Sequence, residues 1–186
     1  MSPDGGTIAP VAQPAAVYNK ETGRLEQLVS DRDGDGKADT RASMDGNRLL
    51  KIEIDRDNDG RVDRWEYYGE APTDRVIPGS PVGRAEIQRV DEADGAGDRV
   101  TRREFYEQGQ LRRVEDDSDA NGRTDRWEFY ENGLLARIEL DAQGRGFADR
   151  RFFYRRDGSI ERVDVNPKGD GTWSPARQPA ASHATR

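Results

Sequence analysis

Hydrophobic and polar positions along this chain repeat with an offset of 24 residues. Gln110–Gly133 aligns with Leu134–Asp157 at that offset, and Glu86–Gly109 aligns with Gln110–Gly133 without a gap. Leu25–Asn47 and Leu49–Ala71 are separated by the same offset. A fixed period of this length is typical of repeat architectures, in which one supersecondary unit is copied along the chain. We therefore expect about six copies of one structural unit.

Each unit is predicted to form two strands joined by a tight turn. Residues 125–130 alternate along a strand, so Trp127 and Phe129 lie on one face, and Arg126, Glu128 and Tyr130 lie on the other. Residues 134–140 form the second strand. Between the two strands, Asn132-Gly133 supplies the positive φ angles that a tight hairpin turn requires.

The second strand has a feature that leaves two interpretations open. Leu135 and Ile138 are three positions apart, so they would point to opposite faces of a regular strand. Either the strand contains a bulge, or both faces of a thin sheet share the apolar side chains. Charged neighbours such as Arg126 with Glu128, and Arg137 with Glu139, are expected to form ion pairs between strands, each contributing only tenths of a kcal/mol.

The order strand, tight turn, strand, acidic loop predicts an all-β fold. We expect an antiparallel β-meander of about six 24-residue repeats, forming an elongated or curled single sheet. The acidic loops should lie along one edge, two strands or roughly 9–10 Å apart. The predicted organisation is a flexible leader over residues 1–14, a repeat domain over 15–173 with a proline- and glycine-containing loop insertion at 70–83, and a disordered tail over 174–186.

Three of the loops between units carry acids at alternating positions. Loop one is residues 31–39, loop two is 55–63 and loop four is 117–125, and positions within each loop are numbered from one to nine. Positions one, three, five and nine are Asp in loops one and two, and loop four has Asn121 at position five. Position six is Gly in all three, which permits a sharp turn. Solvated turns also favour Asp, Asn and Gly, but three recurrences in one register argue against that alternative.

This arrangement of oxygen donors predicts calcium binding. Ca²⁺ takes six to eight hard oxygen ligands in a flexible geometry, and position seven would add a backbone carbonyl. We predict about three Ca²⁺ sites, with the following ligands: Asp31, Asp33, Asp35, Lys37 and Asp39 in loop one; Asp55, Asp57, Asp59, Arg61 and Asp63 in loop two; Asp117, Asp119, Asn121, Arg123 and Asp125 in loop four.

The ligand that closes each site has two candidates. Position twelve, the bidentate Glu of an EF-hand, corresponds to Glu66 and Glu128 but to Ala42 after loop one. Position nine is Asp in all three loops, so Asp39, Asp63 and Asp125 are the preferred closing ligands. Loop three at 93–101, loop five at 141–149 and loop six, which begins at Asn166, have lost acids and are predicted to bind weakly or not at all.

The loops resemble those of EF-hands, and also the Asp-rich calcium loops of dockerins and thrombospondin type 3 repeats. The resemblance covers only the nine to twelve residues of each loop, because the flanking segments are strand-like rather than helical, as in Leu50–Ile54 and Arg64–Tyr68. The whole chain is similar to tandem Asp-rich strand–loop repeats of secreted or surface proteins of bacteria. Because loops of this type usually work at the high calcium concentration outside the cytosol, we expect an extracytoplasmic location, either secreted, periplasmic or at the cell surface. A flexible leader that begins with Ser2-Pro3-Asp4 would suit a lipoprotein whose lipid anchor in the native precursor was replaced by Met1.

The amino-acid composition argues against several classes of function. Hydrophobic residues are 32% and charged residues 36% of the chain, and the mean hydropathy is −1.06, so little apolar surface is available for a thick core. There is no Cys, and the single His183 lies in the predicted tail, which leaves few catalytic nucleophiles or zinc ligands. No long apolar run predicts a transmembrane segment, no signal peptide is visible, and a net charge of −7 makes nucleic acid an unlikely partner.

We therefore expect a non-catalytic calcium-binding repeat protein in which Ca²⁺ stabilises the hairpin junctions. Its role would be structural, with self-association through sheet edges as one form of assembly. The alternative is a calcium-dependent carbohydrate-binding or adhesive module that presents its aromatic rows to a glycan or cell-surface partner. An enzyme, such as a glycosidase with two carboxylates, is disfavoured because the repeat already accounts for the acids.

Overall fold

The computed structural model describes residues 14–70, 85–94 and 99–176, and these form β-strands joined by turns and loops. No helix occurs in these ranges, and so none that is long and apolar enough to cross a membrane. The all-β fold class is confirmed. The chain divides into two compact units, residues 1–98 and 99–186, each of which is an antiparallel β-meander.

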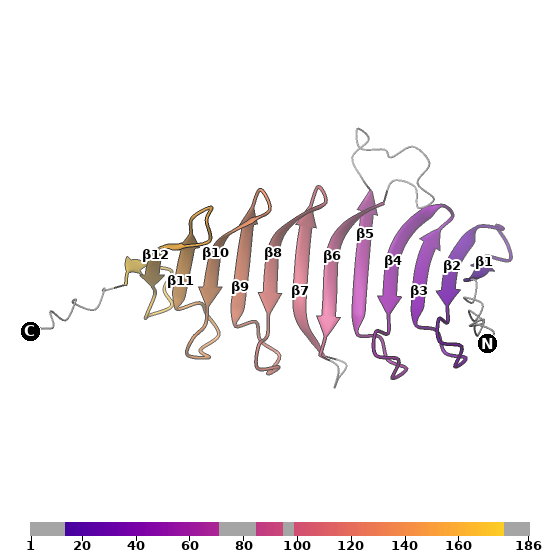
Figure 1. Cartoon of the computed structure of the whole chain (residues 1–186), viewed down its shortest axis with the longest axis horizontal. Coiled ribbons are helices and arrows are strands. Elements are labelled where there is room, and N and C mark those ends of the chain that lie inside the picture. Colours follow the sequence, from indigo (N-terminus) through magenta and orange to yellow (C-terminus); the bar gives the residue numbers. More distant parts are fainter. Residues whose placement is uncertain (1–13, 71–84, 95–98, 177–186) are drawn as a thin grey trace, which may run out of the picture. The chain divides into compact units, whose positions relative to one another are not determined.

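The described part of unit 1 contains six strands, and their order in the sheet is their order in the sequence. They are β1 (Ala15–Tyr18), β2 (Leu25–Ser30), β3 (Thr40–Asp45), β4 (Arg48–Ile54), β5 (Arg64–Glu70) and β6 (Ala85–Ala93). Each neighbouring pair is antiparallel. Loops one and two, which join β2 to β3 and β4 to β5, lie at the same edge of this unit, opposite the β3–β4 turn (Figure 1).

Unit 2 repeats this arrangement with seven strands between residues 99 and 176. They are β7 (Val100–Glu107), β8 (Gln110–Asp116), β9 (Arg126–Glu131), β10 (Leu134–Leu140), β11 (Arg150–Tyr154), β12 (Ile160–Val165) and β13 (Ser174–Pro175). Loops four and five lie at one edge of the unit, and the β7–β8 and β9–β10 turns lie at the other (Figure 1). The predicted separation of acidic loops from tight turns is therefore present in both units.

Parts of the predicted domain organisation fall outside the described residues. These parts are residues 1–13 of the expected leader, 71–83 of the expected loop insertion and 177–186 of the expected tail. Within the expected tail, Ser174 and Pro175 pair with Val165 and Asp164 as a short final strand. The paired sheet therefore continues two residues beyond residue 173, the last residue of the predicted repeat domain.

The pairing register decides between the two interpretations of β10. The register shifts between Leu135 and Arg137, so one residue is inserted as a bulge. Leu135 then pairs with Tyr130, and Ile138 pairs with Glu128, which places both apolar side chains on one face. Equivalent shifts occur in the β3–β4, β5–β6, β7–β8 and β11–β12 hairpins. The bulge is thus a regular part of the repeat.

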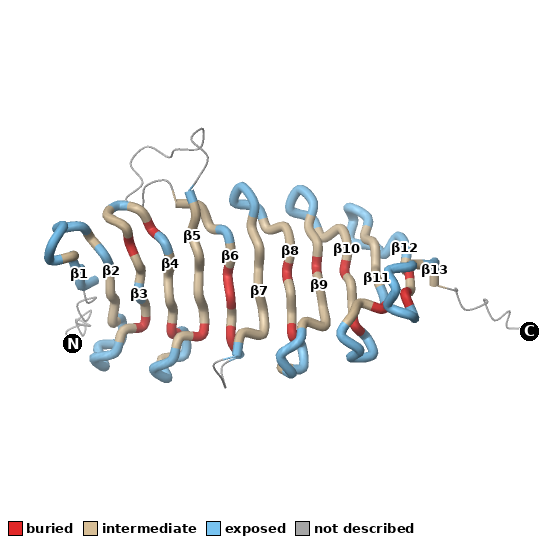
Figure 2. Tube along the Cα trace, turned by 180° about the vertical axis from the view of Figure 1, so that it is seen from behind, coloured by how far each residue is buried: buried red, intermediate tan, exposed pale blue. Residues whose placement is uncertain are grey.

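Burial in this structure is shared between apolar and acidic side chains. The buried hydrophobic residues of the described part are Met44, Leu49, Val90, Ala93, Val114 and Ile138. The buried polar ones are more numerous, and nine of them carry a carboxylate: Asp39, Asp55, Asp63, Asp91, Asp117, Glu128, Asp141, Asp149 and Asp164. Many buried positions lie where strands meet the loop edge (Figure 2). Because a buried carboxylate is costly without a partner, the loop edge requires compensating positive charge.

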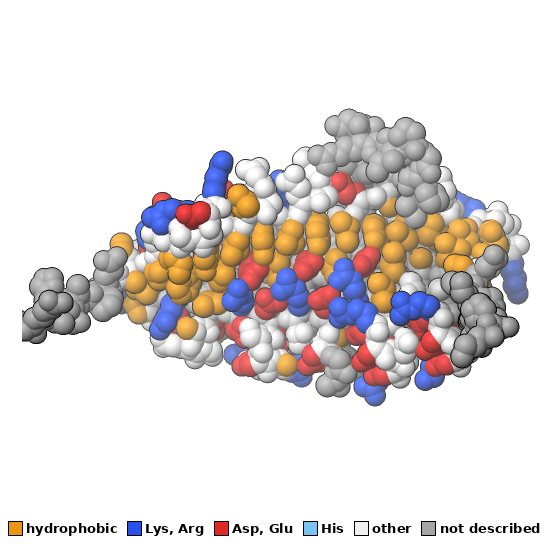
Figure 3. Space-filling model, in the orientation of Figure 1, with side chains coloured by type: hydrophobic (Ala, Val, Ile, Leu, Met, Phe, Trp, Pro, Cys, Tyr) orange, Lys and Arg blue, Asp and Glu red, His pale blue; other side chains and the backbone are white. Residues whose placement is uncertain are grey.

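The two faces of each sheet differ. Register places Tyr106, Leu111, Tyr130, Leu135, Tyr154 and Ile160 in one row on the first face of unit 2. Figure 3 shows hydrophobic side chains in such a row, with a band of charged side chains between it and the acidic loops. On the opposite face, arginine side chains stack on the rings of Phe105, Phe129 and Phe153. Tyr67 of unit 1 is covered in the same way by Arg89.

Candidate metal centres

The described acidic loops share one backbone conformation. The residues at positions four and six have positive φ angles in loops one, two, four, five and six, with position four being Gly34, Asn58, Ala120, Gly144 and Gly169. The sequence predicts the role of Gly at position six. Position four is Gly or Asn in four of these five loops, a signal for positive φ that our prediction did not use, and Ala120 adopts a φ of 55° there despite its side chain. The loop shape therefore does not depend on a complete set of acids.

The acid at position one organises the turn from its centre. Oxygens of Asp31, Asp55 and Asp117 accept hydrogen bonds from the N–H groups of the Gly residues at position six, at 2.9, 2.8 and 2.7 Å. In loop one a second N–H, from Gly34, donates to Asp31 at 2.7 Å. These bonds fold the loop around the carboxylate, and they leave its remaining lone pairs facing the other acids.

The acid at position nine closes the loop from the other side. Its N–H bonds to the carbonyl of the residue just before the loop, at 2.9 Å for Asp39 to Ser30 and 3.0 Å for Asp63 to Ile54. Its carboxylate in turn accepts the N–H at position two, as from Arg32 to Asp39 at 2.6 Å. Asp39 and Asp63 are buried, with exposed fractions of 6% and 9%.

Positions one, three and nine converge in each of the three loops. The groups are Asp31, Asp33 and Asp39; Asp55, Asp57 and Asp63; and Asp117, Asp119 and Asp125. Within each group, one carboxylate oxygen from each residue lies within 4.8 Å of the others. Three oxygens at this separation can hold a metal ion. Without an ion, each charge pair repels by about 3 kcal/mol at an effective dielectric constant near 20.

Positions five and seven, which were also predicted as ligands, are bound to each other. The N–H groups of Lys37, Arg61 and Arg123 donate to side-chain oxygens of Asp35, Asp59 and Asn121, at 2.7, 2.8 and 2.9 Å. Asp35 and Asp59 are exposed and are not members of the converging groups. Their role as ligands, and that of the three carbonyls at position seven, stays a prediction.

Loop two contains an oxygen that lacks a partner. Oδ1 of Asp55 is buried and has no hydrogen-bond partner among the described residues, and the whole side chain is only 5% exposed. A charged oxygen in this state is costly unless a cation binds it. Across the loop, Arg56 Nε lies 2.5 Å from Asp63 Oδ1, so this guanidinium already neutralises one member of the group.

Loop five shows what happens when a cation is supplied by the chain. Position five is Arg145, and its guanidinium lies 3.5 Å from the buried carboxylate of Asp149 at position nine. The same guanidinium donates to the carbonyl of Pro167 at 2.8 Å and stacks on Phe147. Burial alone would raise the pKa of Asp141 at position one, but hydrogen bonds from backbone N–H groups, Arg145 first among them, lower it. A positive side chain thus occupies the loop that has lost its acids at positions three and five.

Loops three and six lack a converging group of acids within the described residues. Ala93 and Thr101 occupy positions one and nine of loop three, and residues 95–98 between them are outside the described part. In loop six, Asn166 replaces Asp at position one and its side-chain oxygen accepts the Gly169 N–H at 3.0 Å. The backbone turn survives there although the ligand set does not.

Glu66 and Glu128, the alternative closing ligands, belong to a different network. Glu128 accepts hydrogen bonds from Tyr130 at 2.6 Å and Arg126 at 2.6 Å, and Glu66 is held in the same way by Tyr68 and Arg64. Burial alone would raise the pKa of Glu128, but these hydrogen bonds lower it. Burial and the bond to Glu128 raise the pKa of Tyr130 to about 12. Neither glutamate joins the acidic groups of the loops.

Comparison with known proteins gives little further information. No family model matches the chain, and no curated protein matches it. A crystal structure of accessory secretory protein 1, 2 and 3 in Streptococcus pneumoniae is similar over 69% of this chain and 19% of that chain, with 15% identity and a TM-score of 0.32. A crystal structure of TcdB2-TccC3 is similar over 86% of this chain and 11% of that chain, with 12% sequence identity and a TM-score of 0.28. At these TM-scores neither similarity supports an argument about function.

Proposed function

We propose that this protein is a non-catalytic, calcium-stabilised repeat module in which three Ca²⁺ ions hold the hairpin junctions at loops one, two and four. The observation that carries the proposal is the recurrence of one three-carboxylate group at the same register in three loops with the same backbone conformation. Hard carboxylate oxygens around a flexible loop favour Ca²⁺ over softer metals. Three such ions would bring the formal charge from −7 to −1.

Two further observations support a structural role for the ions. Among the described residues, the buried carboxylates outnumber the buried hydrophobic side chains, and four of them, Asp39, Asp55, Asp63 and Asp117, belong to the acidic groups of the loops. Folding without cations therefore leaves repulsion within these groups. Loop five, which has lost its acids at positions three and five, contains a guanidinium instead, as expected where positive charge is required for the turn to pack. Ion binding to the folded chain then adds directly to its stability.

The experiment is a calorimetric titration of the metal-free chain with Ca²⁺, combined with thermal unfolding in calcium and in EDTA. We expect about three bound ions, weaker binding of Mg²⁺ because it tolerates crowded carboxylate cages poorly, and a large fall in Tm on chelation. No heat of binding together with an unchanged Tm in EDTA would overturn the proposal.

A matched pair of variants tests the assignment of the loops. Asp57 is a member of the acidic group of loop two, whereas Asp94 is in loop three and belongs to no such group. Asp57→Ala should reduce the stability gained from calcium, and Asp94→Ala should leave it unchanged. Equal effects of the two substitutions would show that the acids act through general charge and not through defined sites.

The location and assembly of the module are part of the proposal. Loops of this kind suit the high calcium concentration outside the cytosol, so we place the protein at an extracytoplasmic site, secreted or at the cell surface. Self-association is proposed through β1, an edge strand of unit 1 whose four residues are all exposed and include Val17 and Tyr18. Light scattering over a range of protein concentrations, with Tyr18→Lys as the comparison, tests this assembly.

The alternative of a glycan-binding aromatic row is less favoured by the geometry. A sugar that stacks on an aromatic ring requires an open ring face. The rings of Tyr67, Phe105 and Phe129 each have a guanidinium 4.0–4.3 Å from the ring centre, supplied by Arg89, Arg113 and Arg137. These cation–π contacts occupy the faces that a sugar would use.

A further inference from the structure

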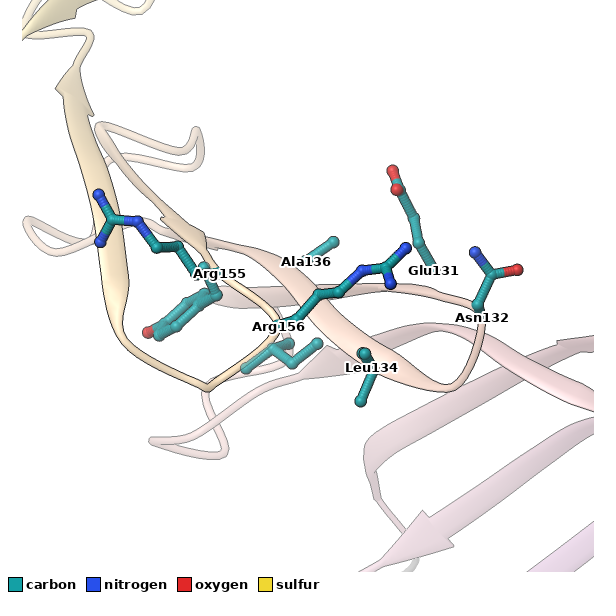
Figure 4. Close-up of a pocket in the computed structure, with 8 residues that line it drawn as sticks. Glu131, Asn132, Leu134, Ala136, Arg155 and Arg156 are labelled. Carbon is teal, nitrogen blue, oxygen red and sulfur yellow. The ribbon is translucent and has the colours of Figure 1, made fainter.

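We propose that unit 2 binds an acidic saccharide, through the carboxylate of a uronic acid residue, in a pocket at the edge opposite the acidic loops. The pocket has a volume of about 410 Å³ and lies between the β9–β10 turn and the end of β11. Its lining residues are Glu131, Asn132, Leu134, Leu135, Ala136, Tyr154, Arg155 and Arg156 (Figure 4). This site is separate from the metal centres and does not rest on calcium binding.

The pocket exists because the last hairpin departs from the repeat. In the β9–β10 hairpin Tyr130 pairs with Leu135, five positions later, whereas in the β11–β12 hairpin Tyr154 pairs with Ile160, six positions later, so the last hairpin contains one extra residue. Its connection, residues 155–159, starts with Arg155 and Arg156. In Figure 4 the Arg156 side chain extends toward the turn that carries Glu131 and Asn132, and Arg155 points the other way. Arg156 stands where the preceding repeat has Asn132, 24 residues earlier, so this replacement adds a cation to an edge that is otherwise apolar at Leu134 and Leu135.

Polar groups in the pocket are available for a ligand. Arg155 is engaged, because it donates to the carbonyl of Ile160 at 3.0 Å. The side chains of Arg156, Asn132 and Glu131 make no hydrogen bond or ion pair with other described residues. They therefore present a guanidinium, an amide and a carboxylate around one apolar floor.

Tyr154 supplies a second departure from the repeat. At the equivalent positions, Tyr68, Tyr106 and Tyr130 donate their hydroxyl hydrogen to a glutamate two residues earlier, at 2.6–2.7 Å. In β11 that glutamate is replaced by Phe152, so the Tyr154 hydroxyl has no partner within the described residues. A ring with a free hydroxyl in a pocket wall can stack on a sugar and bond to one of its hydroxyls.

The combination of groups selects the ligand class. An inorganic anion would pair with Arg156 but leave the floor of Leu134, Leu135 and Ala136 in contact with water. A fatty acid would cover the floor but would leave Asn132 and Glu131 desolvated without partners. A uronic acid sugar satisfies both the polar groups and the apolar floor. Its carboxylate pairs with the guanidinium of Arg156, and its hydroxyls bond to the Asn132 amide and the Glu131 carboxylate. Its ring face covers Leu135 and Tyr154.

The test is calorimetric titration of the calcium-loaded chain with a galacturonate disaccharide, corrected by titrating the sugar into the same calcium buffer. We expect saturable binding, at least tenfold weaker binding of the matching neutral galactose disaccharide, and about a tenfold loss with Arg156→Gln, which removes a charge-assisted hydrogen bond. Tyr154→Phe should weaken binding by a smaller factor.

Two variants serve as controls, because they make the same chemical changes away from the pocket. Arg103→Gln on β7 removes one positive charge, and Tyr106→Phe removes a hydroxyl at the equivalent repeat position. Both should bind the disaccharide as the unmodified chain does. The proposal is overturned if no saturable binding occurs, if the neutral sugar binds equally well, if acetate or sulfate competes as strongly as the uronate, or if Arg103→Gln weakens binding as much as Arg156→Gln.

Discussion

At the scale of single residues, Asp55 combines burial, charge and a missing partner. Replacing Asp55 with Asn keeps the size of the side chain but removes one charge from the acidic group of loop two. In EDTA, Asp55→Asn should stabilise the chain by roughly 1–3 kcal/mol, because repulsion with Asp57 and Asp63 is relieved. In saturating calcium the same variant should be less stable than the unmodified chain, because a ligand has been weakened.

The change in stability caused by Asp55→Asn should therefore have opposite signs in EDTA and in calcium, and this reversal distinguishes a metal site from an acidic turn. Urea unfolding of both proteins, in calcium and in EDTA, measures it directly. If Asp55→Asn is more stable in both conditions, Asp55 contributes only repulsion and loop two is not a calcium site.

Ala120 holds a conformation that its side chain disfavours. The left-handed region costs a residue with a Cβ atom roughly 1–2 kcal/mol, and Asn tolerates it better. Ala120→Asn, which copies position four of loop two, should therefore raise the free energy of unfolding in calcium by up to about 1 kcal/mol. Ala142→Asn in loop five is the control, since the φ angle of Ala142 is not positive. A loss of stability at position 120 would contradict the expectation.

The hydrogen bond from Tyr130 to Glu128 should make stability depend on pH. The folded-state pKa of Glu128 is lowered, so its contribution is present above the ordinary glutamate pKa of about 4.3 and is lost as the pH falls through the lowered value. Tyr130→Phe should cost about 1–2 kcal/mol at pH 7, and the difference from the unmodified chain should shrink at pH 3.

Urea unfolding at the two pH values measures this difference, and NMR titration of the Glu128 carboxyl group should show its pKa rising in the variant. Tyr154→Phe is the control, because the Tyr154 hydroxyl has no glutamate partner in its strand. A difference between Tyr130→Phe and the unmodified chain that stays constant with pH would exclude an electrostatic role for the bond.

At the scale of elements, we expect that one substitution in loop five creates an additional calcium site. Its backbone already has the positive φ angles of the acidic loops, at Gly144 and Gly146, and it keeps Asp141 and Asp149 at positions one and nine. Arg145→Asp removes the internal cation and supplies the missing oxygens at position five. We expect one additional Ca²⁺ per chain by calorimetry, whereas Arg145→Lys should add none. An unchanged ion count in Arg145→Asp would show that position five does not decide occupancy.

The elements also show why some features were predictable from sequence and others were not. The 24-residue period and the alternation in segments such as 125–130 depend on local side-chain pattern, so strands, turns and loop edge followed from it. The position of the bulge beside Leu135 depends on cross-strand pairing, which left two interpretations open. The strand at Ser174–Pro175 has no pattern of its own and forms only because β12 presents an edge.

The candidate metal centres and the pocket also include features that the sequence predicted and features that it did not. Asp39, Asp63 and Asp125 were predicted to close the loops from their recurrence, and they do join the acidic groups. The pairing of position five with the N–H at position seven could not be read from residue types. The pocket beside Arg156 was also missed, and its only signals were the extra residue in the last hairpin and the replacement of Glu by Phe152 in front of Tyr154.

At the scale of the whole molecule, the two units should differ in their response to calcium. Within the residues that the structure describes, unit 1 contains two acidic groups and unit 2 contains one. Each ion at a concentration of 100 times its Kd stabilises the folded state by about 2.7 kcal/mol. Adding EDTA should therefore reduce amide hydrogen-exchange protection more in β2–β5 than in β11–β12.

Hydrogen exchange monitored by mass spectrometry, with and without EDTA, tests this difference. The Asp57→Ala variant provides a reference, since it should lower protection in β4 and β5 even when calcium is present. Equal loss of protection in both units on chelation would contradict the assignment of ions to individual loops.

Successive loops are also joined by one recurring backbone hydrogen bond. The N–H at position one of a loop bonds to the carbonyl at position nine of the preceding loop, at 2.8 Å for Asp55 to Asp39, 2.8 Å for Asp141 to Asp125 and 2.9 Å for Asn166 to Asp149. Main-chain atoms alone make this link, so it persists whether the side chains are acidic, amide or basic. The loops can consequently differ in their acids without a change in the link between them, so under the proposed function the number of bound Ca²⁺ ions could vary from loop to loop while the architecture stays the same.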